Sequence, residues 1–184
     1  MRCFLAVDLP DRLAADVRAV QERFADAAGL RPVAPESAHV TLTFLGDVDP
    51  GRLDDAAAAT ERAVDAANVE SFDVTVAGLG VFPSLDYISV VWAGVAQGSD
   101  ELSRLAAAIE RETTAVGFDP VDHDFLAHVT VGRMDDARGK SRVQRVVSEE
   151  SPTVGTFRAT EVRLKESTLG AGGPTYDTVK RFAL

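Results

Sequence analysis

A chain of 184 residues, 46% of them hydrophobic and 26% charged, has the composition of a globular protein with room for one ordinary core. No stretch approaches the roughly 20 uninterrupted apolar residues of a membrane span, so we expect no membrane partner. The net charge of −10 disfavours a protein that binds nucleic acid broadly and nonspecifically, although it leaves room for a small site for one phosphate.

The N-terminal run MRCFLAVDLP is apolar but short, and it reaches Asp8 rather than a small-residue cleavage site. We therefore expect a cytoplasmic protein. Its single cysteine, Cys3, cannot form an internal disulfide, which fits a reducing compartment, and its place in an apolar run predicts a packing role.

In the first half of the chain, apolar residues alternate between strand and helix periodicity. A buried strand over Arg2–Leu9 stops at Pro10, and the apolar spacing from Leu13 to Phe24 predicts an amphipathic helix that Gly29 ends. After a proline-containing link, we expect a strand over Ala38–Leu45, an alanine-rich helix over Gly51–Ala67, and strands over Phe72–Val81 and Tyr87–Val95.

The second half opens with a helix near Ser99, whose first turn holds Asp100 and Glu101, where acidic residues suit the helix dipole. Helices among hairpin-connected strands indicate the α+β class, and the lack of a linker predicts one domain over residues 1–184. The remaining expected elements are a strand over Ala127–Val131, a short helix over Val143–Val147, a long strand over Thr156–Ser167, a turn over Gly170–Pro174 and a last strand over Thr178–Leu184.

One segment of the sequence is repeated. AHVTLTFLG, over Ala38–Gly46, reappears as AHVTVGR over Ala127–Arg133, each time after a strand and a helix. The repeat predicts a duplicated lobe, with the two similar strands facing each other across a cleft.

Both repeats place a histidine beside a threonine on one strand face, because side chains alternate across a strand. In the second repeat His128 and Thr130 share a face. In the first repeat one face holds His39, Thr41 and Thr43, and the other holds Val40, Leu42 and Phe44. A single His-x-Thr strand is most often a packed structural histidine, but two copies indicate a functional pair.

Two imidazoles and two hydroxyls suit the opening of a phosphodiester. A neutral imidazole takes a proton from water and an imidazolium gives one to the leaving alkoxide, and both forms exist near neutral pH. The threonine hydroxyls can donate to the non-bridging oxygens, where negative charge develops. Side chains move the protons in such a reaction, so we expect no metal and no cofactor.

These motifs resemble the two-histidine (2H) phosphoesterase superfamily, and within it the RNA 2′,3′-cyclic phosphodiesterases, also called 2′-5′ RNA ligases. The two His-x-Thr-x signatures of that superfamily are matched by His39-Val40-Thr41-Leu42 and His128-Val129-Thr130-Val131. The resemblance extends to MRCFLAVDLP at the N-terminus, HVTLTFLGDV at the first motif, the hairpin GVFPSLDYISVVWAGV and the C-terminal KESTLGAGGPTYDTVKRFAL.

The resemblance implies two pseudo-symmetric lobes of antiparallel sheet backed by helices, with the active site in the cleft between them. It implies His39 and His128 as the catalytic acid–base pair, Thr41 and Thr130 as phosphate ligands, and RNA ends with a 2′,3′-cyclic phosphate as substrate. We take His39 as proton donor and His128 as proton acceptor, with the reverse assignment left open by the sequence. Arg133 matches an arginine that follows the second motif in this family. Strict alternation would point Arg133 away from His128, so an ion pair at the strand end is the alternative.

The sequence departs from the family in two places. Relatives often have basic residues before the central tryptophan and a proline before the second histidine, where this chain has Asp86–Ser89 and Phe125–Ala127. The lack of positive charge there argues against affinity for long RNA, without affecting the chemistry.

Three other features favour structural readings. Asp122-His123-Asp124 lacks the spacing of a metal site and is expected to be a surface loop. The glycine-rich run from Gly170 lacks the Lys-Ser/Thr of a phosphate-binding loop and is expected to be a turn. Phe44 and Phe82 could stack on a base, but core packing is the favoured interpretation.

Three functions compete on this sequence. The first is metal-independent hydrolysis of 2′,3′-cyclic phosphate ends of RNA to 2′-phosphates, with reverse 2′-5′ ligation as a minor activity. The second keeps the chemistry but acts on small cyclic nucleotides, which the acidic charge favours. The third is a nucleotide- or RNA-end-binding module without turnover, which would not require both imidazoles. We expect a monomer.

Overall fold

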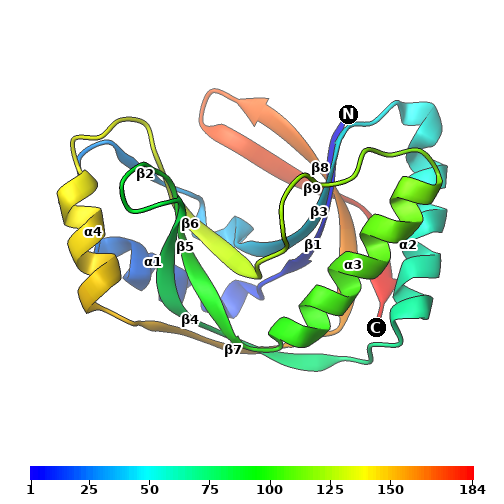
Figure 1. Ribbon diagram of the computed structural model, residues 1–184, viewed down its shortest axis with the longest axis horizontal. Coiled ribbons are helices and arrows are strands. Elements are labelled where there is room, and N and C mark those ends of the chain that lie inside the picture. The colour runs from blue at the N-terminus through cyan, green and yellow to red at the C-terminus, as the bar shows by residue number, and fades with distance from the viewer.

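A nine-stranded, curled antiparallel sheet is the centre of the computed structural model, which describes residues 1–184 (Figure 1). The strand order is β7-β4-β5-β6-β3-β1-β8-β9, with β2 paired to β6 beside this path. The strands are β1 (Arg2–Asp8), β2 (Leu30–Pro32), β3 (His39–Asp47), β4 (Phe72–Pro83), β5 (Ile88–Gln97), β6 (His128–Met134), β7 (Thr153–Ala159), β8 (Glu161–Gly170) and β9 (Gly173–Ala183).

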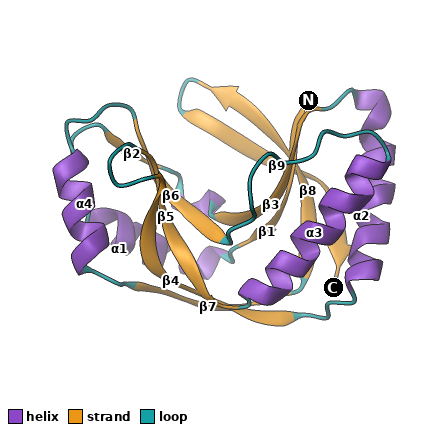
Figure 2. Ribbon diagram, viewed as in Figure 1, coloured by secondary structure: helices purple, strands orange, loops and turns teal.

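Four α-helices lie on the convex side of this sheet in two pairs (Figure 2). They are α1 (Ala14–Glu22), α2 (Leu53–Ala67), α3 (Ser99–Ala115) and α4 (Lys140–Glu149). The mixture of helices with a purely antiparallel sheet confirms the predicted α+β class. No helix is both long and apolar enough to cross a membrane.

The sheet divides into two lobes that exchange helices. The first lobe consists of β3, β1, β8 and β9, and α2 and α3 pack on it. The second lobe consists of β2, β6, β5, β4 and β7, where α1 contacts β6 and β7 and α4 contacts β4. Thus α1 follows a strand of the first lobe but covers the second, and α3 follows a strand of the second lobe but covers the first.

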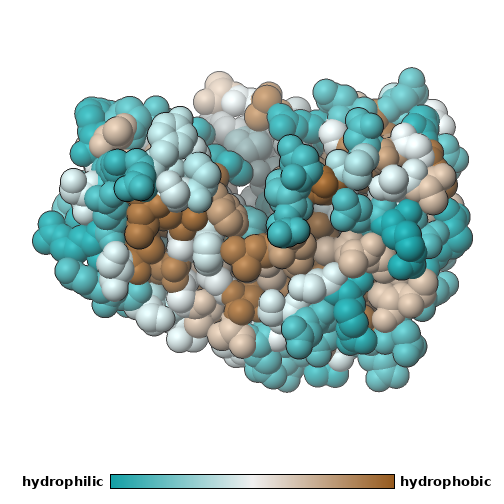
Figure 3. Space-filling model, in the orientation of Figure 1, coloured by the Kyte–Doolittle hydropathy of each residue, from teal (hydrophilic) through white to brown (hydrophobic).

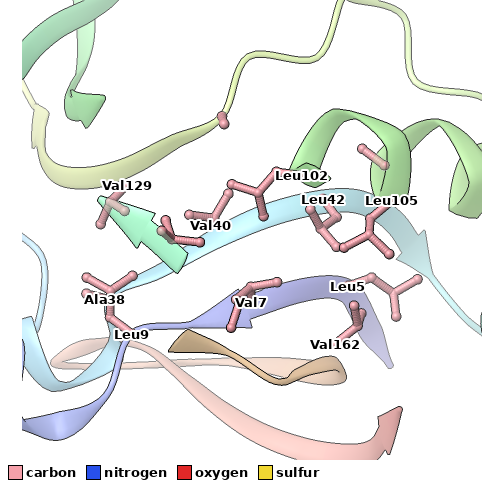
Figure 4. Packing of buried hydrophobic residues seen from close by; sticks show 14 of the residues in the cluster. Leu5, Val7, Leu9, Ala38, Val40, Leu42, Leu102, Leu105, Val129 and Val162 are labelled. Carbon is pink, nitrogen blue, oxygen red and sulfur yellow. The ribbon is translucent and has the colours of Figure 1, made fainter. Parts of the chain in front are cut away.

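The two lobes meet at a seam between β3 and β6, where Val40 is paired with Val129. The strands with the repeated motif are therefore neighbours within one sheet, and the expectation that they face each other across a cleft is wrong. Both valines are fully buried, and Figure 4 shows them side by side with Leu102 of α3 close to Val40.

Forty-two buried residues from both lobes form one continuous hydrophobic cluster. The run Cys3–Val7 of β1 is buried without interruption, because helices cover one face of this central strand and side chains of the concave face cover the other. The buried Cys3 has the packing role predicted for it.

The predicted long strand over Thr156–Ser167 is wrong, since β7 and β8 are separate strands with Thr160 between them. β7 pairs with β4 in the second lobe, whereas β8 pairs with β1 in the first. The alternation of buried and exposed residues changes phase at Thr160: the buried apolar residues just before it are odd-numbered, and those just after it are even-numbered. The residues in question are Phe157, Ala159, Val162 and Leu164.

Two smaller expectations also change. The proline-containing link includes the short strand β2, whose Arg31 pairs with Arg133 of β6. The last strand begins at Gly173 rather than Thr178, so the β8–β9 hairpin is longer than predicted and its turn is shorter.

Candidate active site

The two motif histidines open the two strands of the seam. His39 is the first residue of β3 and His128 the first residue of β6. Because these strands are antiparallel about the seam pair, the register sets His39 next to Thr130 and His128 next to Thr41. Each imidazole therefore lies beside the threonine of the other motif. The structure brings together all four residues predicted from the repeat.

Both imidazoles are held by the same main-chain contact. Nδ1 of His39 lies 2.7 Å from the carbonyl oxygen of Ser37. Nδ1 of His128 lies 2.7 Å from the carbonyl oxygen of Leu126. A carbonyl only accepts, so Nδ1 of each ring is the donor and Nε2 is left for chemistry.

Aromatic rings surround each histidine. Tyr176 of β9 meets His39 edge-on with ring centroids 5.2 Å apart, and Phe4 of β1 lies 5.1 Å from the same ring. Phe82 of β4 meets His128 edge-on at 4.9 Å. These rings fix the imidazole planes and remove water from one side of each histidine.

Burial has an electrostatic effect on both histidines. It lowers the pKa of His39 below its ordinary value, because desolvation disfavours the imidazolium, while the hydrogen bond to Ser37 works in the opposite direction. The pKa of His128 is lowered by burial as well, against the hydrogen bond to Leu126, and Arg133 adds to the lowering. Both rings therefore favour the neutral form, in which Nε2 is a free acceptor.

A bulge in β3 corrects the predicted faces of the first motif. Thr41 pairs with Ala6 and Thr43 with Leu5, so Leu42 is an extra residue and the alternation changes phase. Thr43 is consequently buried and donates to the carbonyl oxygen of Leu42, instead of sharing a face with His39.

The same bulge brings Phe44 to the concave face. Its ring is 55% exposed and lies 6.0 Å from the ring of Phe4, which also contacts His39. The favoured core role for Phe44 is therefore wrong, and Phe82 is only half-buried beside His128. Alternation alone could not have revealed this, because a bulge leaves no mark in the apolar pattern.

A matching bulge in β6 settles the direction of Arg133. Trp92 pairs with Thr130 and Val91 with Gly132, so one residue of β6 is extra. Arg133 then pairs with Val90, which shares a face of β5 with Trp92, so that Arg133 lies on the concave face with the second motif. The strict-alternation argument against it is wrong, and no ion pair engages its guanidinium, whereas Arg31 beside it is paired with Asp135.

Trp92 lies directly over Gly80 of the neighbouring strand. A Cβ at Gly80 would come within 2.2 Å of the indole ring, so only glycine allows this approach. The indole lies 5.2 Å from the Phe82 ring and 6.1 Å from His128. The β4–β5 hairpin thus provides the aromatic wall of the second lobe, and sequence reasoning singled out this segment without assigning Trp92 a place.

A charged cluster borders His39 that the sequence did not reveal. Lys165 of β8 donates to both carboxylate oxygens of Asp8, at 2.8 and 2.7 Å, and Arg163 donates to one of them at 2.7 Å. With Ser37 and Tyr176, these residues line a cavity of about 460 Å³.

The other predicted features do not form part of the histidine pair, although the charge of His123 adds slightly to the lowering of the His128 pKa. Asp122, His123 and Asp124 are exposed, as expected of a surface loop, and line a separate cavity of about 640 Å³ against α3. No three His, Cys, Asp or Glu side chains are placed to hold a metal ion. The glycine-rich run forms the turn between β8 and β9, as predicted. Figure 3 shows the surface hollowed between the lobes, with hydrophobic side chains gathered over β4 and β5.

Comparisons with known proteins identify the family of this chain. A family model described as the 2′-5′ RNA ligase superfamily matches residues 9–170. A protein of Methanothermobacter thermautotrophicus named RNA 2′,3′-cyclic phosphodiesterase is 36% identical over 189 residues, covering 100% of this chain and 99% of that protein. One of the same name from Archaeoglobus fulgidus is 34% identical over 183 residues, covering 99% of each.

Solved structures share the fold over the whole chain. E. coli LigT complexed with 3′-AMP superposes with a TM-score of 0.80 at 26% identity, covering 100% of this chain and 97% of that one. TT0787 of Thermus thermophilus superposes with a TM-score of 0.79 at 28% identity, covering 100% and 98%. The sequence match, the curled antiparallel sheet and the paired motifs lead to one conclusion: the chain belongs to the 2′-5′ RNA ligase superfamily.

Proposed function

We propose that this protein hydrolyses 2′,3′-cyclic phosphates at RNA ends to 2′-phosphates, with His39 and His128 as its acid–base pair. The observation that supports this most directly is the pair of seam histidines, each with Nδ1 tied to a main-chain carbonyl and Nε2 left free. The relatives named RNA 2′,3′-cyclic phosphodiesterase support the same reaction.

The proposed step is a displacement at phosphorus. Nε2 of His128 takes a proton from the attacking water as the new P–O bond forms. Nε2–H of His39 gives its proton to the 3′-oxygen as the P–O3′ bond breaks. The products are a 2′-phosphate and a free 3′-hydroxyl, and the two histidines have exchanged protonation states. Reversal of this step, with a 5′-hydroxyl in place of water, would form a 2′-5′ bond.

The assignment of donor and acceptor follows from the charges around the rings. Asp8 is paired in register with His39, whereas Gly94 occupies the corresponding position beside His128. Burial lowers the pKa of both rings most. Among the charged groups, Lys165 lowers and Asp8 raises the pKa of His39, whereas Arg133 lowers that of His128 with no carboxylate to oppose it. Because a carboxylate lies opposite His39 in register and none lies opposite His128, we assign His39 as the proton donor and His128 as the proton acceptor.

The remaining polar groups of the concave face suit the phosphate. The hydroxyls of Thr41 and Thr130 can donate to the non-bridging oxygens, which gain charge as the pentavalent state forms. Arg133, with no acidic partner, adds a positive charge on the same face. No step requires a metal ion or a cofactor, and we propose none.

A small cyclic nucleotide is the second candidate substrate. Arg163 and Lys165 are already bound to Asp8, so Arg133 is the unpaired cation beside the second motif, and a long anionic strand would find few further partners. A site with few free cations suits a terminal phosphate and one or two nucleotides. The solved complex of E. coli LigT with 3′-AMP fits a site of that size.

The deciding experiment is a comparison of two substrates in excess EDTA. An oligonucleotide ending in a 2′,3′-cyclic phosphate and the matching cyclic mononucleotide are each incubated with the protein, and the products are identified as 2′- or 3′-phosphates. Faster turnover of the oligonucleotide to a 2′-phosphate supports the RNA-end activity. Faster turnover of the mononucleotide supports the second candidate. Binding without turnover, or activity that chelation removes and Zn²⁺ or Mn²⁺ restores, would overturn the two-histidine mechanism.

A further inference from the structure

A buried lysine lies next to the first histidine, and the proposed reaction does not use it. Lys165 is only 5% exposed, which is rare for lysine unless the charge is paired. Its ammonium holds both oxygens of Asp8 and lies 5.8 Å from the centre of the Tyr176 ring. That ring in turn meets His39 edge-on.

The second lobe has no counterpart to this arrangement. Asp8 is opposite His39 in the β1–β3 register, and the equivalent residue opposite His128 is Gly94. An acid–base pair needs one histidine that gives a proton and one that takes it, yet both have the same hydrogen bond and similar aromatic neighbours. The Asp8–Lys165 pair beside His39 and the unpaired Arg133 beside His128 are thus the charged differences between the two halves of the site.

We infer that Asp8 and Lys165 are positioning residues that act through His39 and set its proton affinity for the proposed reaction. Asp8 favours the imidazolium of His39, and the ammonium of Lys165 opposes it by more. The inference rests on the proposed function only where it concerns turnover, since the effect on the ring itself exists without substrate.

The groups that face His39 are few. Asp8 comes from β1, Lys165 and Arg163 from β8, Tyr176 from β9 and His128 from β6. Burial lowers the pKa of His39 most, and the hydrogen bond to Ser37 opposes it. Of the charged neighbours, Lys165 and His128 lower this pKa further, whereas Asp8 raises it. Removing Lys165 should therefore raise the proton affinity of His39, and removing Asp8 should lower it.

The test is a titration of the His39 ring by NMR in Lys165→Met and Asp8→Asn. Only three histidines are present, and His39→Gln assigns the resonance. In Lys165→Met, Asp8 is still bound by Arg163. The midpoint of the His39 titration should rise by about one pH unit, because the cation that disfavours the imidazolium is gone. Asp8→Asn leaves Lys165 uncompensated, and the midpoint should fall. A purely structural role would not give shifts of opposite sign.

The control variant is Arg158→Met, which removes the same charge from an exposed pair with Asp73 in the second lobe. Its His39 titration should match the wild type, and thermal unfolding checks that each variant is folded. If Asp8→Asn is unfolded, the sign of the Lys165→Met shift decides alone. No shift in Lys165→Met, or a shift equal to that of Arg158→Met, would overturn the inference.

Turnover separates this inference from the proposed function. If His39 is the proton donor, the alkaline limb of the pH–rate profile should move with the NMR midpoint, upward in Lys165→Met and downward in Asp8→Asn. If the NMR midpoint of His39 moves but the alkaline limb of the pH–rate profile does not, the Asp8–Lys165 pair does act on His39, but His39 is not the proton donor.

Discussion

Phe44 and Arg133 occupy equivalent positions in the two lobes. Each is the fifth residue after its motif histidine, and each reaches the concave face because a bulge precedes it in the strand. Strict alternation would place both on the opposite face. The pseudo-symmetric site therefore ends in an exposed aromatic ring on one side and an unpaired guanidinium on the other, which suits a nucleotide with a base at one end and a phosphate at the other.

The unpaired guanidinium should account for the salt dependence of the enzyme. Each phosphate contact made by a cation releases counterions, and beside the motif residues Arg133 is free to make one. We expect KM for a cyclic-phosphate oligonucleotide to change with salt by about one ion equivalent, and Arg133→Met to remove that dependence. KM measured across a salt series on short and long substrates tests this. A steep dependence with tighter binding of long RNA would point to a basic groove elsewhere.

Each motif histidine should be essential to turnover. We expect His39→Ala or His128→Ala to lower kcat by about 10² or more, because each variant loses a general acid or base. His123→Ala is the matched control, since His123 is exposed in the loop before β6, its ring is hydrogen-bonded to the carbonyl of Asp124, and its charge is the last-ranked of the influences on His128. Initial rates with a saturating cyclic substrate measure the effect, and a near-normal rate in either motif variant would remove that residue from the mechanism.

The two motif threonines should affect kcat more than KM. Thr41→Val and Thr130→Val keep the side-chain shape but lose the donor to an oxygen that gains charge in the transition state, so kcat should fall roughly 10- to 100-fold. The serine variants keep a hydroxyl and should retain most of the activity. If the valine and serine variants have equal rates, the hydroxyls do not contact the phosphate.

Stability should decrease as the solution becomes mildly acidic. The ordinary pKa of a histidine is 6.5, and burial lowers the pKa of His39 and His128 in the folded protein. Just below about pH 6.5 the unfolded chain therefore binds more protons than the folded one, and the free energy of unfolding falls as the pH is lowered. Above about pH 6.5 both histidines are neutral in either state, and their contribution to stability is fully present. Thermal unfolding from about pH 7.5 to about pH 5 should show this slope. His39→Gln/His128→Gln should flatten it, and an unchanged slope in the double variant would refute the assignment.

Much of this fold could be predicted from the sequence, because the apolar periodicity of its strands and helices is regular. The repeated Ala-His-Val-Thr segment located the site, since each copy opens a strand with one buried face. The boundary at Thr160 was missed even though the phase of the apolar residues changes there. No proline or glycine separates the two strands at this point, so one continuous strand was the simpler interpretation.

Other parts of the site depend on pairing that a single sequence does not contain. The faces of Phe44 and Arg133 depend on extra residues opposite β1 and β5, which become visible only once the strands are in register. The contact of Lys165 with Asp8 joins residues at opposite ends of the chain, and it exists because β8 pairs with β1. Tertiary pairing, not local propensity, determines both.

The exchange of α1 and α3 between the lobes bears on how the protein loses its structure. Neither lobe is a continuous piece of chain, so no truncation yields one lobe with its own covering helices, and melting one lobe exposes the apolar face of a helix connected to the other. The molecule should therefore unfold in one cooperative step, with equal calorimetric and van't Hoff enthalpies. Partial opening of the half that holds His128 without loss of the half that holds His39 is not available to this topology.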